Sequence, residues 1–253
     1  MSRIVVSADD FGLCPEINEA ICLLHDRGVV RRASFIVNMD GFESSVEALR
    51  SRPSLDVAVH LNLTDGRPIL PAALVPTLVD RKGFFHGGRH HYGVVARIAA
   101  GRMRTGEIHR EWRAQIEKAR AAGLRIQQLN SHGHLHLLPR LHGIVLALLH
   151  EFEISDVRLV RSFDSVRGVL LSVCSLRLMR SLKRHGPAAV APDRTLGLRR
   201  PGSIDARIDL RRPAGADAST ELIAHPSKGS NEYHRRWGYA GDDELARLLN
   251  ESI

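Results

Sequence analysis

Two adjacent aspartates near the N-terminus are the first residues whose types suggest chemistry. In RIVVSADDFG (3–12) an apolar run ends at Asp9 and Asp10, and Gly12 then lets the backbone turn. Burying two unpaired carboxylates side by side is costly, so such a pair usually holds a cation, shares a proton, or divides the roles of ligand and base. Because histidine clusters follow downstream, the pair indicates a metal-assisted hydrolase.

Histidines at alternate positions form a second cluster in NSHGHLHLLP, which contains His132, His134 and His136. If an extended strand continues through them, His132 and His134 lie on one face. An aspartate with two histidines leaves coordination positions open for water and substrate, as in catalytic metal sites. Imidazole suits Zn²⁺, and a carboxylate broadens the site to harder ions. The alternative is a surface histidine tract.

Two more histidines occur in or after predicted strands. In DVAVHLNL (56–63) the two-residue period places His60 on the polar face, as a metal ligand or as a hydrogen-bonded structural residue. His225 ends the strand TELIAH, and Pro226 keeps it extended. Such a histidine suits general acid–base work near neutral pH, or a partly buried structural role. Three loop histidines are predicted to be solvated: His86, His90 and His91.

Strand and helix signals alternate along the chain, which predicts βαβ units and a parallel sheet. Strands are expected near 3–9, 33–38, 56–63, 125–131, 157–160 and 220–225. Helices are expected near 15–27, 42–51, 107–122, 140–151, 166–185 and 242–251. The chemically active residues follow strands, and (β/α) barrels carry their active sites at the carboxyl ends of strands. The predicted fold is an α/β, TIM-barrel-like (β/α) barrel of about seven strands.

The chain of 253 residues is predicted to form a single domain, 1–253. Two segments interrupt the regular pattern. Residues 66–105 are predicted to be a long loop that serves as a lid or binding loop. Residues 186–217, rich in Pro, Gly and Arg, are predicted to be an irregular insertion.

Composition narrows the class of protein. The net charge of +8 is compatible with nucleic acid, an anionic membrane or an acidic substrate as partner. No nucleic-acid motif is present, and 5% aromatic residues are too few for base-stacking platforms, so nucleic acid is not expected. Three cysteines without a C-x-x-C pair argue against a disulfide framework. With no signal-peptide pattern and no long apolar run, the expected location is cytoplasmic.

Four motifs together resemble the YdjC-like carbohydrate deacetylases. They are ADDFG (8–12), VHLNLTDGRP (59–68), NSHGHLH (130–136) and AHP (224–226), in the family's order and spread over nearly the whole chain. The family includes chitooligosaccharide deacetylases (ChbG) and hopanoid-biosynthesis-associated proteins (HpnK). The stretch GRPILPAALVPTLVDRKGFF (66–85) is closer to the HpnK-like branch.

The resemblance implies a metal-dependent hydrolase that removes the acetyl group from an N-acetylated amino sugar, in an oligosaccharide or a glycolipid. The products would be acetate and a free amine. It implies one divalent ion, Mg²⁺ or Zn²⁺, bound by Asp10, His60 and His132. By the same matching, Asp9 is the expected base and His225 the expected acid.

One position departs from the family pattern, because Asn130 stands where the family often has Asp. The change affects the hydrogen bonding around the ligands rather than a ligand itself. Two other functions stay open. The same scaffold could hydrolyse an ester, a phosphoester or a glycosidic bond, or the chain could be a non-enzymatic basic binding protein. A homodimer is also left open.

The helix expected at 166–185 has an amphipathic pattern. Its apolar residues at helical spacing are Val173, Leu176, Met179 and Leu182, and its basic residues are Arg177, Arg180, Lys183 and Arg184. Such a helix can lie on an anionic membrane, which makes peripheral membrane contact one hypothesis. The favoured alternative is that the stripe packs on the barrel, as most amphipathic helices of globular proteins do.

Overall fold

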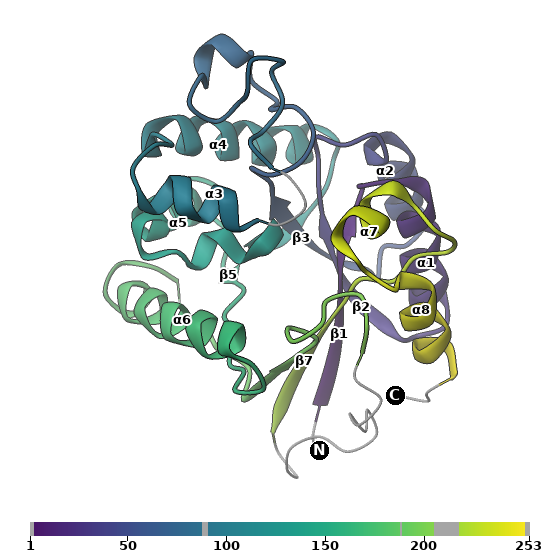
Figure 1. Cartoon of the computed structure of the whole chain (residues 1–253). Helices are drawn as coiled ribbons and strands as arrows, with labels where there is room; N and C mark the ends of the chain where they lie inside the picture. The colour runs from purple at the N-terminus through teal and green to yellow at the C-terminus, as the bar shows by residue number, and fades with distance from the viewer. Residues whose placement is uncertain (1–2, 88–90, 188, 205–217, 251–253) are drawn as a thin grey trace.

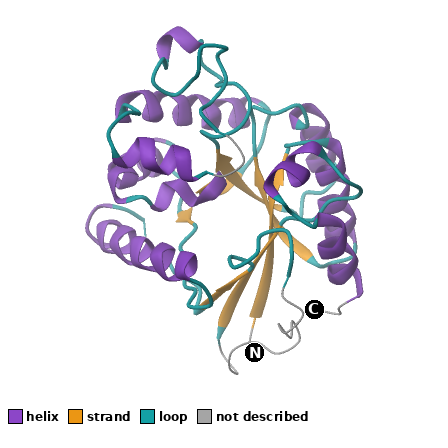
Figure 2. Cartoon of the chain, in the orientation of Figure 1, coloured by secondary structure: helices purple, strands orange, loops and turns teal. Residues whose placement is uncertain are grey.

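A parallel sheet forms the centre of the molecule (Figures 1 and 2). The computed structural model describes residues 3–87, 91–187, 189–204 and 218–250. Its strands are β1 (Arg3–Phe11), β2 (Val30–Phe35), β3 (Asp56–Leu61), β4 (Ile126–Ser131), β5 (Asp156–Val157), β6 (Arg194–Leu196) and β7 (Ser219–Ala224). They run in the order β5-β4-β3-β2-β1-β7-β6, and all their ladders are parallel.

The sheet curls like part of a barrel. Within the described residues no ladder joins the edge strands β5 and β6, so hydrogen bonds do not close the barrel there. The prediction of an α/β, barrel-like fold with about seven strands is confirmed. The crossovers from β1 through to β6 carry their helices outside the sheet, which buries both faces of the central strands.

Helices cover the outer side of the sheet in two groups (Figure 1). One group consists of α1 (Pro15–Asp26), α2 (Phe42–Arg50), α7 (Glu232–Trp237) and α8 (Gly241–Asn250). The other consists of α3 (Tyr92–Ala99), α4 (Thr105–Ala121), α5 (His142–Glu151) and α6 (Val166–His185). Three short 3₁₀ turns complete the set: η1 (Ala72–Leu74), η2 (His132–Leu137) and η3 (Pro139–Leu141). None of the helices in the described part of the chain is long and apolar enough to cross a membrane.

The apolar core divides into two clusters that match the two helix groups. Phe11, Ile17 and Phe35 are fully buried between the sheet and the first group. Leu61 and Trp112 are fully buried in the second cluster. Burial of side chains of this size, at roughly 1.5–3 kcal/mol each, holds the strand ends in fixed positions.

Four of the elements were not expected from the sequence: α3, η1, β6 and α7. Helix α3 lies inside the segment predicted as a long loop, 66–105, together with η1. Helix α3 has eight residues, of which only Val94 and Ile98 are buried, so its periodicity is too short to recognise. Strand β6 and helix α7 are equally short, and the tertiary structure decides them. Of the expected insertion at 186–217, residues 188 and 205–217 lie outside the described residues.

The apolar stripe expected on α6 is only partly correct. Leu182 is buried against the rest of the molecule and Met179 is half-buried, as the packing alternative predicts. Val173 and Leu176 instead remain exposed. The helix begins where the side chain of Ser165 accepts a hydrogen bond from the backbone N–H of Gly168, at 3.1 Å.

Candidate active site

The residues that the sequence singles out meet at the carboxyl ends of the strands. Asp9 and Asp10 lie near the end of β1 and His60 near the end of β3. His132 directly follows β4, and His225 directly follows β7. All five side chains are buried. Strands far apart in the sequence therefore bring their terminal polar residues together, as expected for an α/β barrel.

An irregularity in β1 lets both aspartates reach the site. The ladder between β1 and β2 shifts register between Ala8 and Phe11, and Asp10 has a backbone φ of 69°. In a regular strand the two neighbouring side chains would point to opposite faces. The left-handed conformation is strained for most residues but is tolerated by Asp and Asn. The bulge thus turns Asp10 toward the histidines while Asp9 stays in the barrel.

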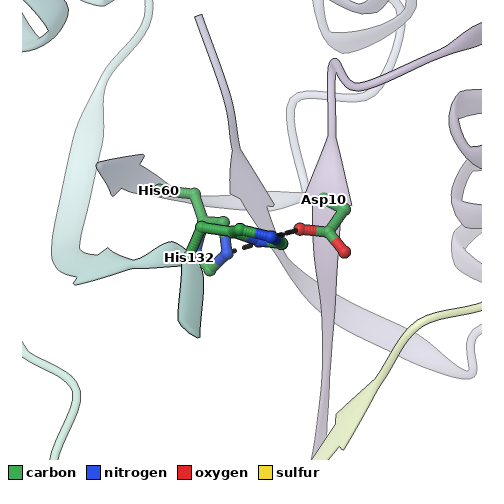
Figure 3. A group of neighbouring side chains, drawn as sticks. All are labelled: Asp10, His60 and His132. Carbon is green, nitrogen blue, oxygen red and sulfur yellow. Dashed lines mark ion pairs between the residues drawn. The ribbon is translucent and has the colours of Figure 1, made fainter. Parts of the chain in front are cut away.

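Asp10, His60 and His132 form a group suited to a cation (Figure 3). Oδ1 of Asp10 lies 2.8 Å from Nδ1 of His132 and 3.5 Å from Nε2 of His60. One ligand atom from each residue fits within 4.8 Å of the others. Neither oxygen of Asp10 has a hydrogen bond of good geometry from the described residues. A buried carboxylate left in this state, facing two imidazoles, fits a divalent ion.

The charges in this group support one another. Burial alone would raise the pKa of Asp10, but the neighbouring His132 holds that pKa well below its usual value. Burial alone would lower the pKa of His132, but Asp10 raises it above its usual value. In the absence of an ion the two residues thus form a charged pair. A divalent ion would take the place of the imidazolium proton, because a ligating histidine must be neutral.

Asn130 orients His60. The Nδ1–H of His60 donates a hydrogen bond to Oδ1 of Asn130 at 2.6 Å, which leaves the lone pair of Nε2 directed toward Asp10. The amide of Asn130 donates in turn to the hydroxyl of Ser34 at 2.9 Å. Asparagine can thus position this ligand as a carboxylate would, but without adding negative charge.

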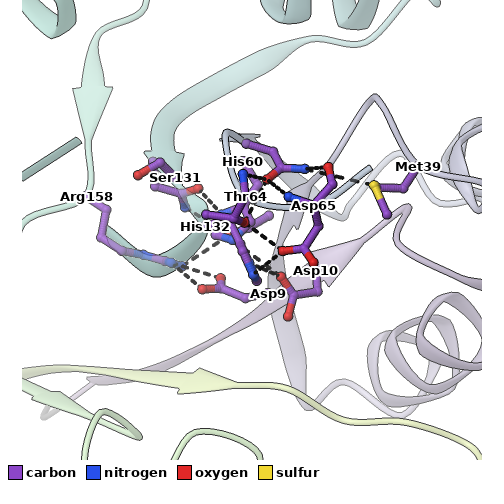
Figure 4. Close-up of polar contacts among 12 residues, drawn as sticks. Asp9, Asp10, Met39, His60, Thr64, Asp65, Ser131, His132 and Arg158 are labelled. Carbon is purple, nitrogen blue, oxygen red and sulfur yellow. Dashed lines mark hydrogen bonds and ion pairs between the residues drawn. The ribbon is translucent and has the colours of Figure 1, made fainter. Parts of the chain in front are cut away.

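Asp9 is held by a residue that the sequence analysis missed. Nη1 of Arg158 donates to both carboxylate oxygens of Asp9, at 2.9 and 2.8 Å (Figure 4). Nε of Arg158 also donates to Glu221 at 3.1 Å, and Nη2 donates to Ser34 at 3.2 Å. Burial would raise the pKa of Asp9, but the Arg158 charge lowers it below its usual value. A lone arginine inside the apolar stretch VRLV (157–160) was the available signal.

His91 is another site residue, and its prediction as a solvated loop histidine is wrong. Its ring lies 4.5 Å from the ring of His132 and 6.2 Å from that of Trp237. Burial lowers its pKa well below the usual value. His91 immediately precedes α3 and so belongs to the segment that the sequence analysis treated as a loop. His86 is half-buried, and His90 lies outside the described residues.

A second carboxylate stands behind His132. Oδ2 of Asp65 lies 3.7 Å from Nε2 of His132, and Asp65, His91 and His132 form another group with ligand geometry. Asp65 also forms an ion pair with Arg236 and accepts a hydrogen bond from Thr64 at 2.7 Å. Because Asp65 already has these partners, whereas among the described residues only His60 and His132 pair with the carboxylate of Asp10, the Asp10 group is the better candidate for the ion.

The other histidines of the cluster separate into two roles. The strand ends at Ser131, and a kinked turn follows in which Gly133 and His134 adopt positive φ values of 66° and 60°. The strand thus ends at the predicted position, near residue 131, and the condition that it continue through His134 is not met. His134 nevertheless lines the pocket. His136 is structural, since its ring nitrogens contact the hydroxyl of Ser131 at 2.8 Å and the carbonyl of Arg158 at 3.0 Å.

A narrow pocket of about 10 Å³, room for roughly one water molecule, opens onto these groups. His225 also lines it, with its ring centroid 5.1 Å from that of Tyr239. Burial lowers the pKa of His225. Its backbone N–H donates to the carboxylate of Glu244 at 2.7 Å, which fixes the turn after β7. Other lining residues come from distant parts of the chain: Arg167, Leu198 and Pro201.

Comparison with curated proteins gives relatives that share one description. A carbohydrate deacetylase of Brevibacillus brevis is 38% identical over 152 residues, which cover 60% of this chain and 57% of the relative. A carbohydrate deacetylase of Mus musculus is 32% identical over 203 residues, which cover 78% of this chain and 63% of the relative. The matched part thus spans about three fifths of the length of these relatives.

A solved structure and a family model agree with this result. The crystal structure of a putative cellobiose-phosphate cleavage protein from Enterococcus faecalis V583 matches with a TM-score of 0.74 and 25% identity. The match covers 98% of this chain and 90% of that one. The family model described as YdjC-like protein matches residues 3–253. Because this model matches nearly the whole chain, the chain belongs to the YdjC-like family.

Proposed function

We propose that this protein is a metal-dependent hydrolase that removes the acetyl group from an N-acetylated amino sugar, in an oligosaccharide or a glycolipid. The products are acetate and a free amine. The observation that carries the proposal is the buried carboxylate of Asp10, which lacks a hydrogen bond of good geometry from the described residues and faces His60 and His132, two residues that line a pocket. The carbohydrate deacetylase descriptions of the relatives support the choice of substrate.

Asp10, His60 and His132 would hold one divalent ion, Mg²⁺ or Zn²⁺. When bound, the ion supplies Lewis acidity toward the acetyl carbonyl and lowers the pKa of water. The mixed set of one carboxylate and two imidazoles admits both ions. Asn130 and its partner Ser34 keep His60 oriented for this task.

Asp9 is proposed as the base that accepts the proton of the attacking water. The Arg158 charge keeps the pKa of Asp9 low, so the side chain is a carboxylate at neutral pH. The same two hydrogen bonds fix its orientation beside the pocket. A base of low pKa is weak, but it is fully deprotonated at neutral pH. It would also act on a water whose own pKa is lowered by the ion.

His225 is proposed as the acid that protonates the leaving amine nitrogen. It lies at the pocket wall, directly after β7, the strand that pairs with the one carrying Asp9. Burial lowers its pKa, while the carboxylates of Asp10 and Asp9 act in the opposite direction and favour the protonated form. Amide cleavage requires such a proton because an amine anion is a poor leaving group.

An assay of released products tests the proposal. The protein is depleted of metal, reloaded with Mg²⁺ or Zn²⁺, and incubated with N-acetylated amino sugars and oligosaccharides. The proposal predicts metal-dependent release of acetate without release of phosphate or new reducing ends. Release of phosphate or reducing sugar without acetate would favour another hydrolase on the same scaffold. Metal-independent, strongly salt-dependent DNA binding without any hydrolysis would favour a basic binding protein.

A further inference from the structure

The outer side of α6 carries an exposed apolar surface. Five residues spaced three or four apart on this helix are exposed: Val166, Val169, Leu170, Val173 and Leu176. Phe163, just before the helix, is 73% exposed, and Val166 and Leu170 are 81% and 61% exposed. Single exposed apolar residues are ordinary, but a continuous row on one helix face marks an interaction surface.

The second half of the same helix is strongly basic. Arg177, Arg180, Lys183 and Arg184 are all exposed and continue the apolar row along the helix axis. The helix contains no acidic residue. None of these four cations has an acidic partner among the described residues. The outer face of α6 thus changes from apolar at its N-terminal half to cationic at its C-terminal half.

The apolar half lies beside the mouth of the candidate active site. Arg167, in the first turn of α6, lines the same pocket as His132 and His225. Figure 1 shows α6 at the periphery of the molecule, with its outer side turned away from the other helices. Whatever binds this face therefore also lies next to the entrance of the pocket.

We infer that the outer face of α6, together with Phe163, binds the surface of an anionic lipid membrane. On an anionic membrane, the apolar side chains of such a helix can enter the acyl boundary while the cations farther along the same face contact anionic headgroups. The pocket that Arg167 lines would then lie near the membrane. A second copy of the chain is a poorer occupant, since it would bring the same unpaired cations to the interface with no acidic residue on α6 to compensate them.

Vesicle co-sedimentation of the intact protein tests the inference without any substrate, so its outcome is independent of the proposed deacetylase activity. Wild-type protein is expected to sediment with vesicles of phosphatidylcholine and phosphatidylglycerol, but not with phosphatidylcholine alone, and added salt should release it. The double variant Val166→Ser/Leu170→Ser should reduce binding on the order of tenfold or more. Arg180→Glu/Arg184→Glu should reduce it at least about 25-fold, since each cation near the surface contributes about fivefold.

The matched control variants carry the same kinds of substitution at other exposed positions. Leu74→Ser removes another exposed leucine, and Arg81→Glu/Lys82→Glu makes the same change in net charge. Both controls should bind anionic vesicles like the wild type. The inference is overturned if wild-type protein does not bind anionic vesicles at low salt, or if the α6 variants bind as well as the controls. Sedimentation velocity showing a dimer that Val166→Ser/Leu170→Ser abolishes, without vesicle binding, would instead assign this face to self-association.

Discussion

A single nitrogen of Arg158, Nη1, donates hydrogen bonds to both carboxylate oxygens of Asp9, at 2.9 and 2.8 Å. Both side chains are buried, and the other side of the guanidinium contacts Glu221 and Ser34. The arrangement keeps Asp9 ionised and directed at the pocket. It also separates the two adjacent aspartates chemically, because Asp9 is neutralised by arginine, whereas Asp10 has only histidines beside it.

Arg158→Lys should change the pH profile of the enzyme rather than its metal content. Lysine keeps the positive charge but cannot reproduce the hydrogen bonds of the guanidinium to Asp9, Glu221 and Ser34 together. With less stabilisation of the carboxylate, the pKa of Asp9 rises, so the acidic limb of the kcat/KM profile moves to higher pH. Metal analysis and a pH–rate profile of acetate release measure both quantities. An acidic limb that does not move would show that Arg158 does not set the pKa of the catalytic base.

Asn130→Ala should weaken metal binding. Removing the amide takes away the acceptor that fixes the Nδ1–H of His60 and so frees the ring to rotate. Loss of such a hydrogen bond typically costs 10–100-fold in metal affinity or activity, and roughly this loss is expected. Ser34→Ala is the informative companion, because Ser34 contacts both Asn130 and Arg158. Ser34→Ala should weaken metal binding slightly and should also shift the acidic limb of the kcat/KM profile to higher pH.

The metal affinity of both variants can be measured by competition with a chelator. Gln127 offers a control, since it is a neighbouring amide whose side-chain oxygen accepts a hydrogen bond from the backbone N–H of Val57, which is not a site residue. Gln127→Ala should leave metal affinity unchanged. Equal affinity in Asn130→Ala and Gln127→Ala would contradict the orienting role of Asn130.

His225→Ala should distinguish substrates by their leaving groups. An activated aryl acetate releases a phenolate that needs no proton, so its hydrolysis should be nearly unaffected. An N-acetyl sugar requires a protonated amine and should lose about 10²–10⁴-fold in kcat/KM. The two rates are compared on the same metal-loaded preparation. Equal losses on both substrates would mean that His225 acts on the structure or on the metal instead.

Glu244→Gln should change how stability depends on pH. Burial raises the pKa of Glu244 to about 8 from its model-compound value of 4.5, despite the hydrogen bond from the backbone N–H of His225. Between these two values the folded state holds a proton that the unfolded state has lost, so the stability contributed by this group falls as pH rises. Gln is always neutral. The free energy of unfolding of Glu244→Gln, relative to that of the wild type, should therefore rise by on the order of 3 kcal/mol between about pH 5 and pH 8.

Urea denaturation at several pH values measures this difference. Asp243→Asn is the control, since Asp243 lies on the same first turn of α8 but is exposed. Its difference from the wild type should stay nearly constant across the same range. A constant difference between Glu244→Gln and the wild type would show that Glu244 is ionised in the folded protein throughout.

The positions of the strand-end residues were predictable. The two-residue period of a strand fixes the face on which each side chain lies, and a parallel sheet brings the carboxyl ends of its strands to one edge. The parity of DVAVHLNL places His60 on the site face, and the doubled aspartate requires the irregularity that the bulge in β1 provides. The strand predicted at 125–131 agrees with β4, and Gly133 turns the chain soon after Ser131, so the alternate histidines do not extend the strand.

Residues that reach the site from other elements could not be derived from local patterns. Arg158 follows a strand of two residues, and its partners lie more than sixty positions away in the sequence. His91 comes into the site through a short helix inside a segment with little periodicity. Their positions depend on how the crossovers pack, which is a property of the tertiary structure. The exposed row on α6 was likewise hidden, because the sequence does not show which face of a helix the sheet covers.

The most direct test compares two substitutions that each remove one charge from the aspartate pair. Asp10→Asn suits the backbone, because asparagine also tolerates the φ of 69°, and Asp9→Asn is its matched control. Metal content and acetate release are measured on both. The account predicts that Asp10→Asn loses metal and activity together, while Asp9→Asn keeps the metal and loses about 10²–10⁴-fold in rate. Full metal occupancy in Asp10→Asn, or wild-type turnover in Asp9→Asn, would contradict it.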